Sequence, residues 1–256
     1  MINPSTIGAD FKNTLAMQYS PIGFYYADKK PKGAVGFKKA GSGCIMPLIL
    51  KSAKGATVAF DEHSTGWDCS AFFLGYKDWI YTGVEYFLSH GPVIGMGGER
   101  FVKTPRLAKQ YLKSLRPTEK AHGTAVFKPL EKFGDLERPE IVIFFANPDQ
   151  LSALVYLLYF SAPLEENRVV ARFASGCASV VTLPLRYARN GMHKAVWGLH
   201  DISARARLPA ELMTLTFPFN LLVDMWKDVK KSFLTTDNWE TIAQRIVNNK
   251  THKKKD

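Results

Sequence analysis

The chain has 256 residues, of which 46% are hydrophobic, and a formal net charge of +11. This length and apolar content are enough to bury a core, which excludes an intrinsically disordered chain. The longest apolar runs, at 141–146 and 151–162, are shorter than the roughly 20 residues of a membrane-spanning helix. The first 15 residues also lack the basic and apolar regions of a secretory signal. We therefore expect a globular, cytoplasmic protein that makes no contact with a membrane.

The positive charge is dense only at the carboxyl end. Residues 249–256 contain four lysines and one aspartate, and the remaining charge is spread along the chain. The aromatic and basic motifs of the usual nucleic-acid-binding modules are absent, so the charge predicts a solubilising surface and no specific nucleic-acid partner. We expect one globular domain over residues 1–248, followed by a basic solvated tail at 249–256.

The first half of the chain alternates short strands and helices. Residues 10–19 place Phe11 and Leu15 on one face, which predicts an amphipathic helix that stops at Ser20 and Pro21. Thr104 and Pro105 have the residue types that open a helix, here predicted over 106–115. Aromatic and β-branched residues predict strands at 22–27, 56–60, 124–127 and 141–146.

The second half begins with a strand followed directly by a helix. Asn147 suits the cap, and Pro148 suits the first position, of a helix over 148–160. This helix is apolar on almost every face, which predicts a core helix enclosed by other elements. We further expect a strand at 203–208, a helix opened by Pro209, and helices at 218–231 and 239–247. Together these elements predict an α+β (mixed α/β) fold, with one compact unit of mixed sheet and packed helices.

The order of several motifs resembles that of the uncharacterised domain-of-unknown-function family 169 of archaea and bacteria. The resemblance covers most of the chain and rests on the Pro21-Ile22-Gly23 beginning of a strand and on the segments SGCIMPLIL, WDCSAFFLG, GGERFVKTPRLA, IVIFFANPDQ and SGCAS. In this chain Ser70 and Ala71 follow the second cysteine, where many relatives are expected to have a small residue and glycine. The resemblance implies that the three cysteines form a set.

The set consists of Cys44, Cys69 and Cys177, which are 25 and 108 residues apart. Such separations lack the close Cys-x-x-Cys pairs of zinc ribbons and common ferredoxins. Three thiolates from separate loops can nevertheless hold three irons of a four-iron cluster and leave the fourth iron open. We therefore expect an iron–sulfur cluster, of the 4Fe-4S type by this ligand count, that serves electron transfer with a redox partner protein or chemistry at the open iron.

Two other interpretations of the cysteines stay open. Free cysteine is among the most buried residue types, so all three could be core residues of a metal-free protein that binds or senses a small-molecule ligand. A zinc site completed by His63 or another histidine is a further metal-binding alternative.

Glycines and cations supply candidates for a ligand pocket. Gly43, Ser70 and Gly176 adjoin the cysteines, and Gly97 and Gly98 belong to a glycine-rich run that matches no phosphate-binding motif. These small residues would let the backbone approach a bulky group. A later segment has a cationic character that suits either a small anion or a solvated face, through Arg186, Arg189, His193, His200, Arg205 and Arg207. No hydrolase motif is found, and the sequence assigns no catalytic residue.

Overall fold

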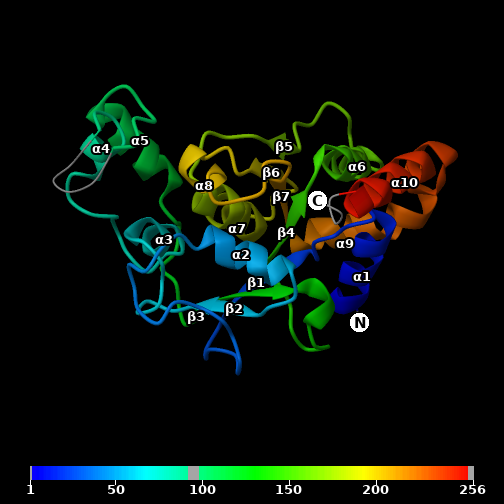
Figure 1. Ribbon diagram of the computed structural model, residues 1–256, viewed down its shortest axis with the longest axis horizontal. Coiled ribbons are helices and arrows are strands. Elements are labelled where there is room, and N and C mark those ends of the chain that lie inside the picture. Colours follow the sequence, from blue (N-terminus) through cyan, green and yellow to red (C-terminus); the bar gives the residue numbers. More distant parts are fainter. Residues whose placement is uncertain (1, 92–97, 253–256) are drawn as a thin grey trace.

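The computed structural model describes residues 2–91 and 98–252, in which helices cover both faces of a seven-stranded sheet (Figure 1). The spatial order of the strands is β2-β3-β1-β4-β7-β6-β5. Neighbouring strands are antiparallel, except that β5 and β6 are parallel. The strands are β1 (Ile22–Ala27), β2 (Val58–Phe60), β3 (Thr124–Pro129), β4 (Ile141–Ala146), β5 (Val169–Val170), β6 (Ala195–Gly198) and β7 (Met213–Pro218). The expected α+β fold with a mixed sheet is confirmed.

The central strand β4 is buried on both faces, which explains its unbroken apolar sequence. Successive side chains of a strand point to opposite faces of the sheet. One hydrophobic cluster accordingly contains Ile141, Ile143 and Phe145, and the other contains Val142, Phe144 and Ala146. The sheet thus separates two cores.

Each core is covered by its own set of helices. The first core contains side chains of α2 (Met46–Ala53), α3 (Asp68–Phe73), α4 (Val84–Phe87), α5 (Pro105–Leu115), the π-helix η2 (Ala178–Thr182), α7 (Leu183–Arg189) and α8 (Ile202–Arg205). The second contains side chains of α1 (Pro4–Thr14), α6 (Pro148–Tyr159), α9 (Phe219–Asp228) and α10 (Asp237–His252), with the short 3-10 turns η1 (Leu130–Lys132), η3 (Val229–Lys231) and η4 (Phe233–Thr235) nearby. Figure 1 shows α4 and α5 at the opposite end of the molecule from α10.

Local sequence signals located several elements correctly. Strands β1 and β4 have the predicted bounds, and β2 and β3 overlap their predicted ranges. The Thr104 side chain caps α5 by accepting a hydrogen bond from the Leu107 amide. Asn147 caps α6 by accepting a bond of 3.0 Å from the Gln150 amide. Here a short polar side chain satisfies an amide that has no partner within the helix.

The first helix lies nearer the amino terminus than predicted. It covers Pro4–Thr14 because Asn3 accepts a 2.8 Å hydrogen bond from the Ser5 amide and Pro4 suits the first position. It ends before Ala16, whose φ of 47° lies in the left-handed region.

The prediction of a strand at 203–208 is wrong. The segment begins with α8 because the Asp201 side chain accepts hydrogen bonds from the Ser203 and Ala204 amides. Pro209 does not open a helix. It lies in the turn that leads to β7, and this strand is absent from the prediction.

Helix α6 is not enclosed as predicted. Tyr156 is 71% exposed, and Ser152 and Phe160 are also exposed, so only one face packs on the sheet. Helices α9 and α10 occupy the two regions predicted as helical near the end of the chain. Helix α10 runs to His252, past residue 249 where we placed the start of the tail, and 253–256 lie outside the described residues. Within the described ranges no helix is long and apolar enough to cross a membrane.

Candidate functional site

Backbone hydrogen bonds tie the loop before Cys44 to the loop before Cys69. The Gly41 amide donates to the Gly66 carbonyl at 2.9 Å, and the Trp67 amide donates to the Gly43 carbonyl at 2.8 Å. A Cβ atom on Gly66 would lie 2.0 Å from the Gly43 oxygen, so only glycine permits this approach. Two cysteines that are 25 residues apart are therefore brought to one place.

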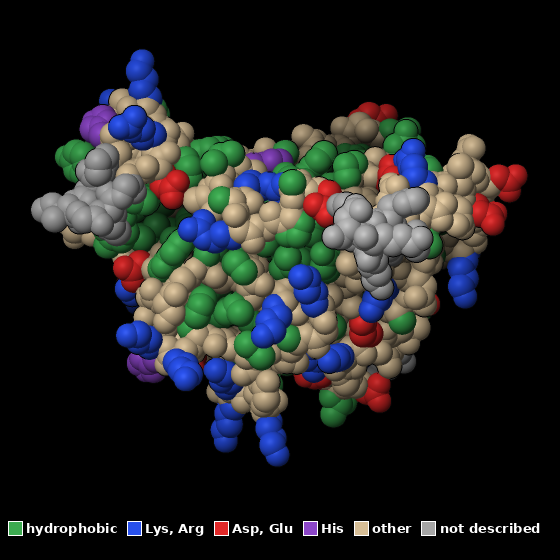
Figure 2. All heavy atoms as spheres, viewed as in Figure 1, with side chains coloured by type: hydrophobic (Ala, Val, Ile, Leu, Met, Phe, Trp, Pro, Cys, Tyr) green, Lys and Arg blue, Asp and Glu red, His purple; other side chains and the backbone are tan. Residues whose placement is uncertain are grey.

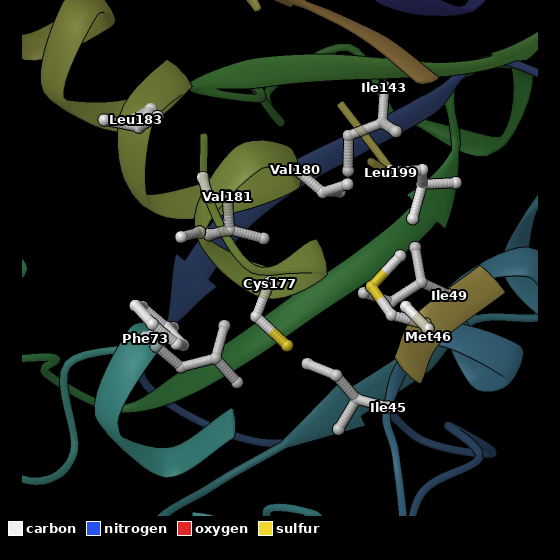
Figure 3. Packing of buried hydrophobic residues seen from close by; sticks show 14 of the residues in the cluster. Ile45, Met46, Ile49, Phe73, Ile143, Cys177, Val180, Val181, Leu183 and Leu199 are labelled. Atoms are coloured by element: carbon white, nitrogen blue, oxygen red, sulfur yellow. The ribbon is translucent and has the colours of Figure 1, made fainter. Parts of the chain in front are cut away.

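All three cysteines lie where a helix begins. Cys44 stands just before α2, Cys69 is the second residue of α3, and Cys177 directly precedes the π-helix η2. In Figure 3 the Cys177 sulfur points toward Ile45, the neighbour of Cys44 in sequence. Cys177 is buried, whereas Cys44 and Cys69 are half-buried at the same hydrophobic core. Short π-helical turns are frequent at functional sites.

The three thiols are close enough to interact electrostatically. Burial raises the pKa of the Cys69 thiol to about 12, and the charge of Cys44 adds to this shift. Burial likewise raises the pKa of Cys177, with further contributions from Cys69 and Cys44. The pKa of Cys44 is also raised, again mainly by burial. A buried thiol favours its neutral form, and each thiolate opposes the formation of the next. Without a cation among them, all three sulfurs therefore keep their protons near neutral pH.

Hydrogen-bonding groups surround the sulfurs. The Cys177 thiol donates a 4.0 Å hydrogen bond to the buried Ser70 hydroxyl, which also interacts with Cys69, so one side chain joins two cysteines. The backbone amide of Met46 interacts with the Cys44 sulfur, and that of Ser70 with the Cys69 sulfur. These donors lower the thiol pKa values, against the effect of burial, because they stabilise the thiolates.

Charged side chains also lie near the thiols. The Asp201 carboxylate interacts with all three thiols, whereas Arg207 acts on Cys44 and places its guanidinium over the Trp67 ring, 4.9 Å from the centroid. Glu99 interacts with Asp201 and Arg207 and with the Ser203 side chain. Burial, followed by the charge of Asp201, raises the pKa of Glu99. One carboxylate and one guanidinium thus lie near the thiols, and a second carboxylate, that of Glu99, interacts with both of them.

Sequence reasoning did not connect Asp201 and Glu99 with the cysteines. Asp201 lies in a segment predicted to lead into a strand, and a capping aspartate is common before any helix. The only available sequence signal was the polar Asp201-Ile202-Ser203 segment, which is typical of a helix start.

The predicted pocket residues have different surroundings. Gly43, Ser70 and Gly176 adjoin the cysteines, and a Cβ on Gly176 would meet the Ala204 side chain at 3.2 Å. Gly98 packs on Gly91, where a Cβ would come within 1.8 Å of the Gly91 Cα. Gly97 lies outside the described residues.

The four arginines among the six predicted cationic residues contact different groups. Arg189 pairs with Glu119 and Glu140. Arg186 donates to the Ser114 and Arg116 carbonyls, and Arg205 donates to the Leu212 and Ala210 carbonyls. Three of the four arginines therefore serve the fold, and Arg207 is the one that interacts with a thiol, that of Cys44.

In residues 2–91 and 98–252, no group of three or more His, Cys, Asp or Glu side chains is arranged to hold a metal ion. His63 is exposed and contacts Glu62 at 3.2 Å, so it gives no support to a zinc site with the cysteines. A four-iron cluster places fewer demands on the ligand positions, because each thiolate binds a different iron. Three thiols with amide and hydroxyl donors have the ligand chemistry that such a cluster requires.

The comparisons with known proteins agree with the motif order. No curated protein and no solved structure matches the chain. The DUF169 family, described as uncharacterised ArCR, matches residues 10–228, a range that contains all three cysteines together with Glu99, Asp201 and Arg207. The chain therefore belongs to the DUF169 family.

Proposed function

We propose that Cys44, Cys69 and Cys177 bind an iron–sulfur cluster that serves electron transfer or a reaction at an iron without a protein ligand. The observation that carries this proposal is the mutual interaction of three thiols from three separate segments, where Ser70 joins Cys69 and Cys177. When bound, a cluster of this kind would supply one-electron redox chemistry and an iron able to coordinate a small molecule.

The chain's own residues would hold the cluster and adjust its properties. The thiols would lose their protons on binding, as metal ligation by cysteine requires. The Met46 and Ser70 amides, which already interact with Cys44 and Cys69, would then donate to sulfur and favour the reduced state. Either a redox partner protein or a small-molecule substrate is compatible with this site.

A cytoplasmic location fits the same chemistry. All three cysteines are free, and reducing compartments keep thiols in this state. We propose this location together with the cluster, since both require reduced sulfur.

The alternative is a metal-free protein that binds a small ligand and uses its cysteines as core residues. Cys177 favours this function because it is only 5% exposed and packs within the first hydrophobic core. Purification decides between the two, because an iron–sulfur protein is coloured and contains both iron and sulfide.

The test is to prepare the protein without oxygen and to measure iron, acid-labile sulfide and visible absorption. Cys44→Ser, Cys69→Ser and Cys177→Ser should each lose most of the iron while circular dichroism shows folded protein. Ser52→Ala, a small change at a buried hydroxyl of α2, is the matched control and should keep its iron. Colourless wild-type protein without iron or sulfide would overturn the proposal and favour the metal-free alternative.

A further inference from the structure

Asp201 contacts two segments that are distant in sequence. Its Oδ2 accepts a 2.8 Å hydrogen bond from the amide of Gly176, the residue before Cys177. Its Oδ1 accepts bonds of 3.0 Å from the Ser203 amide and 2.8 Å from the Ser203 hydroxyl. The carboxylate thus joins the first turn of α8 to the turn that carries Cys177.

A helix cap alone would not use both carboxylate oxygens of Asp201. The four-residue helix α8 is capped through Oδ1 alone, which also accepts from the Ala204 amide at 3.4 Å. The second oxygen is used across 25 residues at Gly176. Gly176 packs closely there, since an added Cβ would lie 3.2 Å from Ala204 and 3.4 Å from Met46. Asp201 therefore fixes the position of Gly176, and with it that of Cys177.

The charge of Asp201 reaches the other cysteines as well. Burial is the main cause of the raised pKa of each thiol, and the Asp201 carboxylate contributes further to all three. Arg207 has the opposite effect on Cys44. Asp201 is half-buried and Arg207 is exposed, so solvent screens the charge of Asp201 less.

We propose that Asp201 is a positioning residue that holds the Cys177 turn and lowers the reduction potential of the cluster through its fixed negative charge. The inference rests on the proposed function, because the potential belongs to the bound cluster. Reduction adds an electron, and a nearby carboxylate makes this addition less favourable. Asp201 and Arg207 would therefore shift the potential in opposite directions.

The test is a redox titration of anaerobically prepared holoprotein, followed by visible absorption and electron paramagnetic resonance. Asp201→Asn keeps the shape of the side chain and one of its two accepting oxygens, and it removes the charge. We expect the midpoint potential to rise by an amount that changes the ratio of oxidised to reduced cluster about tenfold, or about 59 mV for one electron. Arg207→Gln should lower it. Asp68→Asn, next to Cys69 in sequence but paired with Lys77, is the control and should change it little.

An unchanged potential in Asp201→Asn, or an equal rise in Asp68→Asn, would overturn the inference. If Asp201→Asn loses the cluster, the potential of Arg207→Gln still tests whether a fixed charge near the thiols acts on the cluster. An unchanged potential in Arg207→Gln would contradict the electrostatic part of the proposal. If the wild type contains no iron, the proposed function fails, whereas the influence of Asp201 is still measurable. In metal-free protein, Asp201→Ala should then speed hydrogen exchange of the Gly176 amide, because the variant removes the oxygen that accepts its hydrogen bond, and an unchanged rate would count against the positioning role of Asp201.

Discussion

The Trp67 amide donates a 2.8 Å hydrogen bond to the Gly43 carbonyl, so the residues just before Cys69 and Cys44 are joined through the backbone. This contact depends on Gly66, which lies against the Gly43 oxygen without a side chain between them. The position of two candidate ligands is thereby fixed by main-chain atoms and by one glycine.

Gly66→Ala should destabilise the protein, because the new Cβ would lie 2.0 Å from the Gly43 oxygen and the two loops would have to separate. We expect a loss of about 1–3 kcal/mol in the free energy of unfolding, as for other overpacked sites. Gly134→Ala is the control, since its nearest neighbour is the flexible Glu137 carboxylate at 3.4 Å. Urea unfolding followed by circular dichroism gives both values, and equal stability of the two variants would contradict the close contact.

Asn147→Ala should cost about 1 kcal/mol of stability, because it removes the side chain that accepts the Gln150 amide at the start of α6. The same unfolding experiment measures this loss. Asn167→Ala, in the exposed loop after α6, should have little effect. If Asn147→Ala leaves stability unchanged and reduces the iron content instead, Asn147 belongs to the functional site.

The cysteines of metal-free protein should react with iodoacetamide in the order Cys44, Cys69, Cys177. Thiolate is the reactive form, and burial raises all three pKa values, most strongly for buried Cys177. Because pH 8 and pH 9 lie below the pKa of about 12 at Cys69, its rate should rise about tenfold between them. Mass spectrometry of timed samples resolves each site. Rapid labelling of Cys177 before Cys44 would contradict the burial seen here.

Binding to random duplex DNA should be weak and should disappear near physiological salt. On the face seen in Figure 2, apolar and uncharged surfaces lie between the Lys and Arg side chains, and we expect few of them to contact phosphates at once. Fluorescence anisotropy at about 50 and 200 mM salt measures the affinity. A variant that ends at His252 lacks three lysines and should bind still more weakly. Tight binding at the higher salt concentration would show that the charge forms a nucleic-acid site.

The sequence by itself determined the elements whose signals are local. Strand β4 is a continuous apolar run, and the caps at Thr104 and Asn147 act within three residues, so their residue types predict their structure. The α+β class follows from the order of such segments. Motif order likewise indicated the family, and the resemblance implied that the three cysteines form a set.

Only the tertiary structure decided what surrounds that set. Strand β7 separates two helical segments and depends on pairing with β4 and β6, so its local sequence gave no sufficient signal. Asp201 could not be linked to Cys177 in advance, because its cap at α8 is a local feature whereas its bond to Gly176 spans 25 residues. The convergence of the cysteines requires the approach of Gly43 to Gly66 and the packing of η2 against α3, and contacts between distant segments leave no periodic pattern in a single sequence.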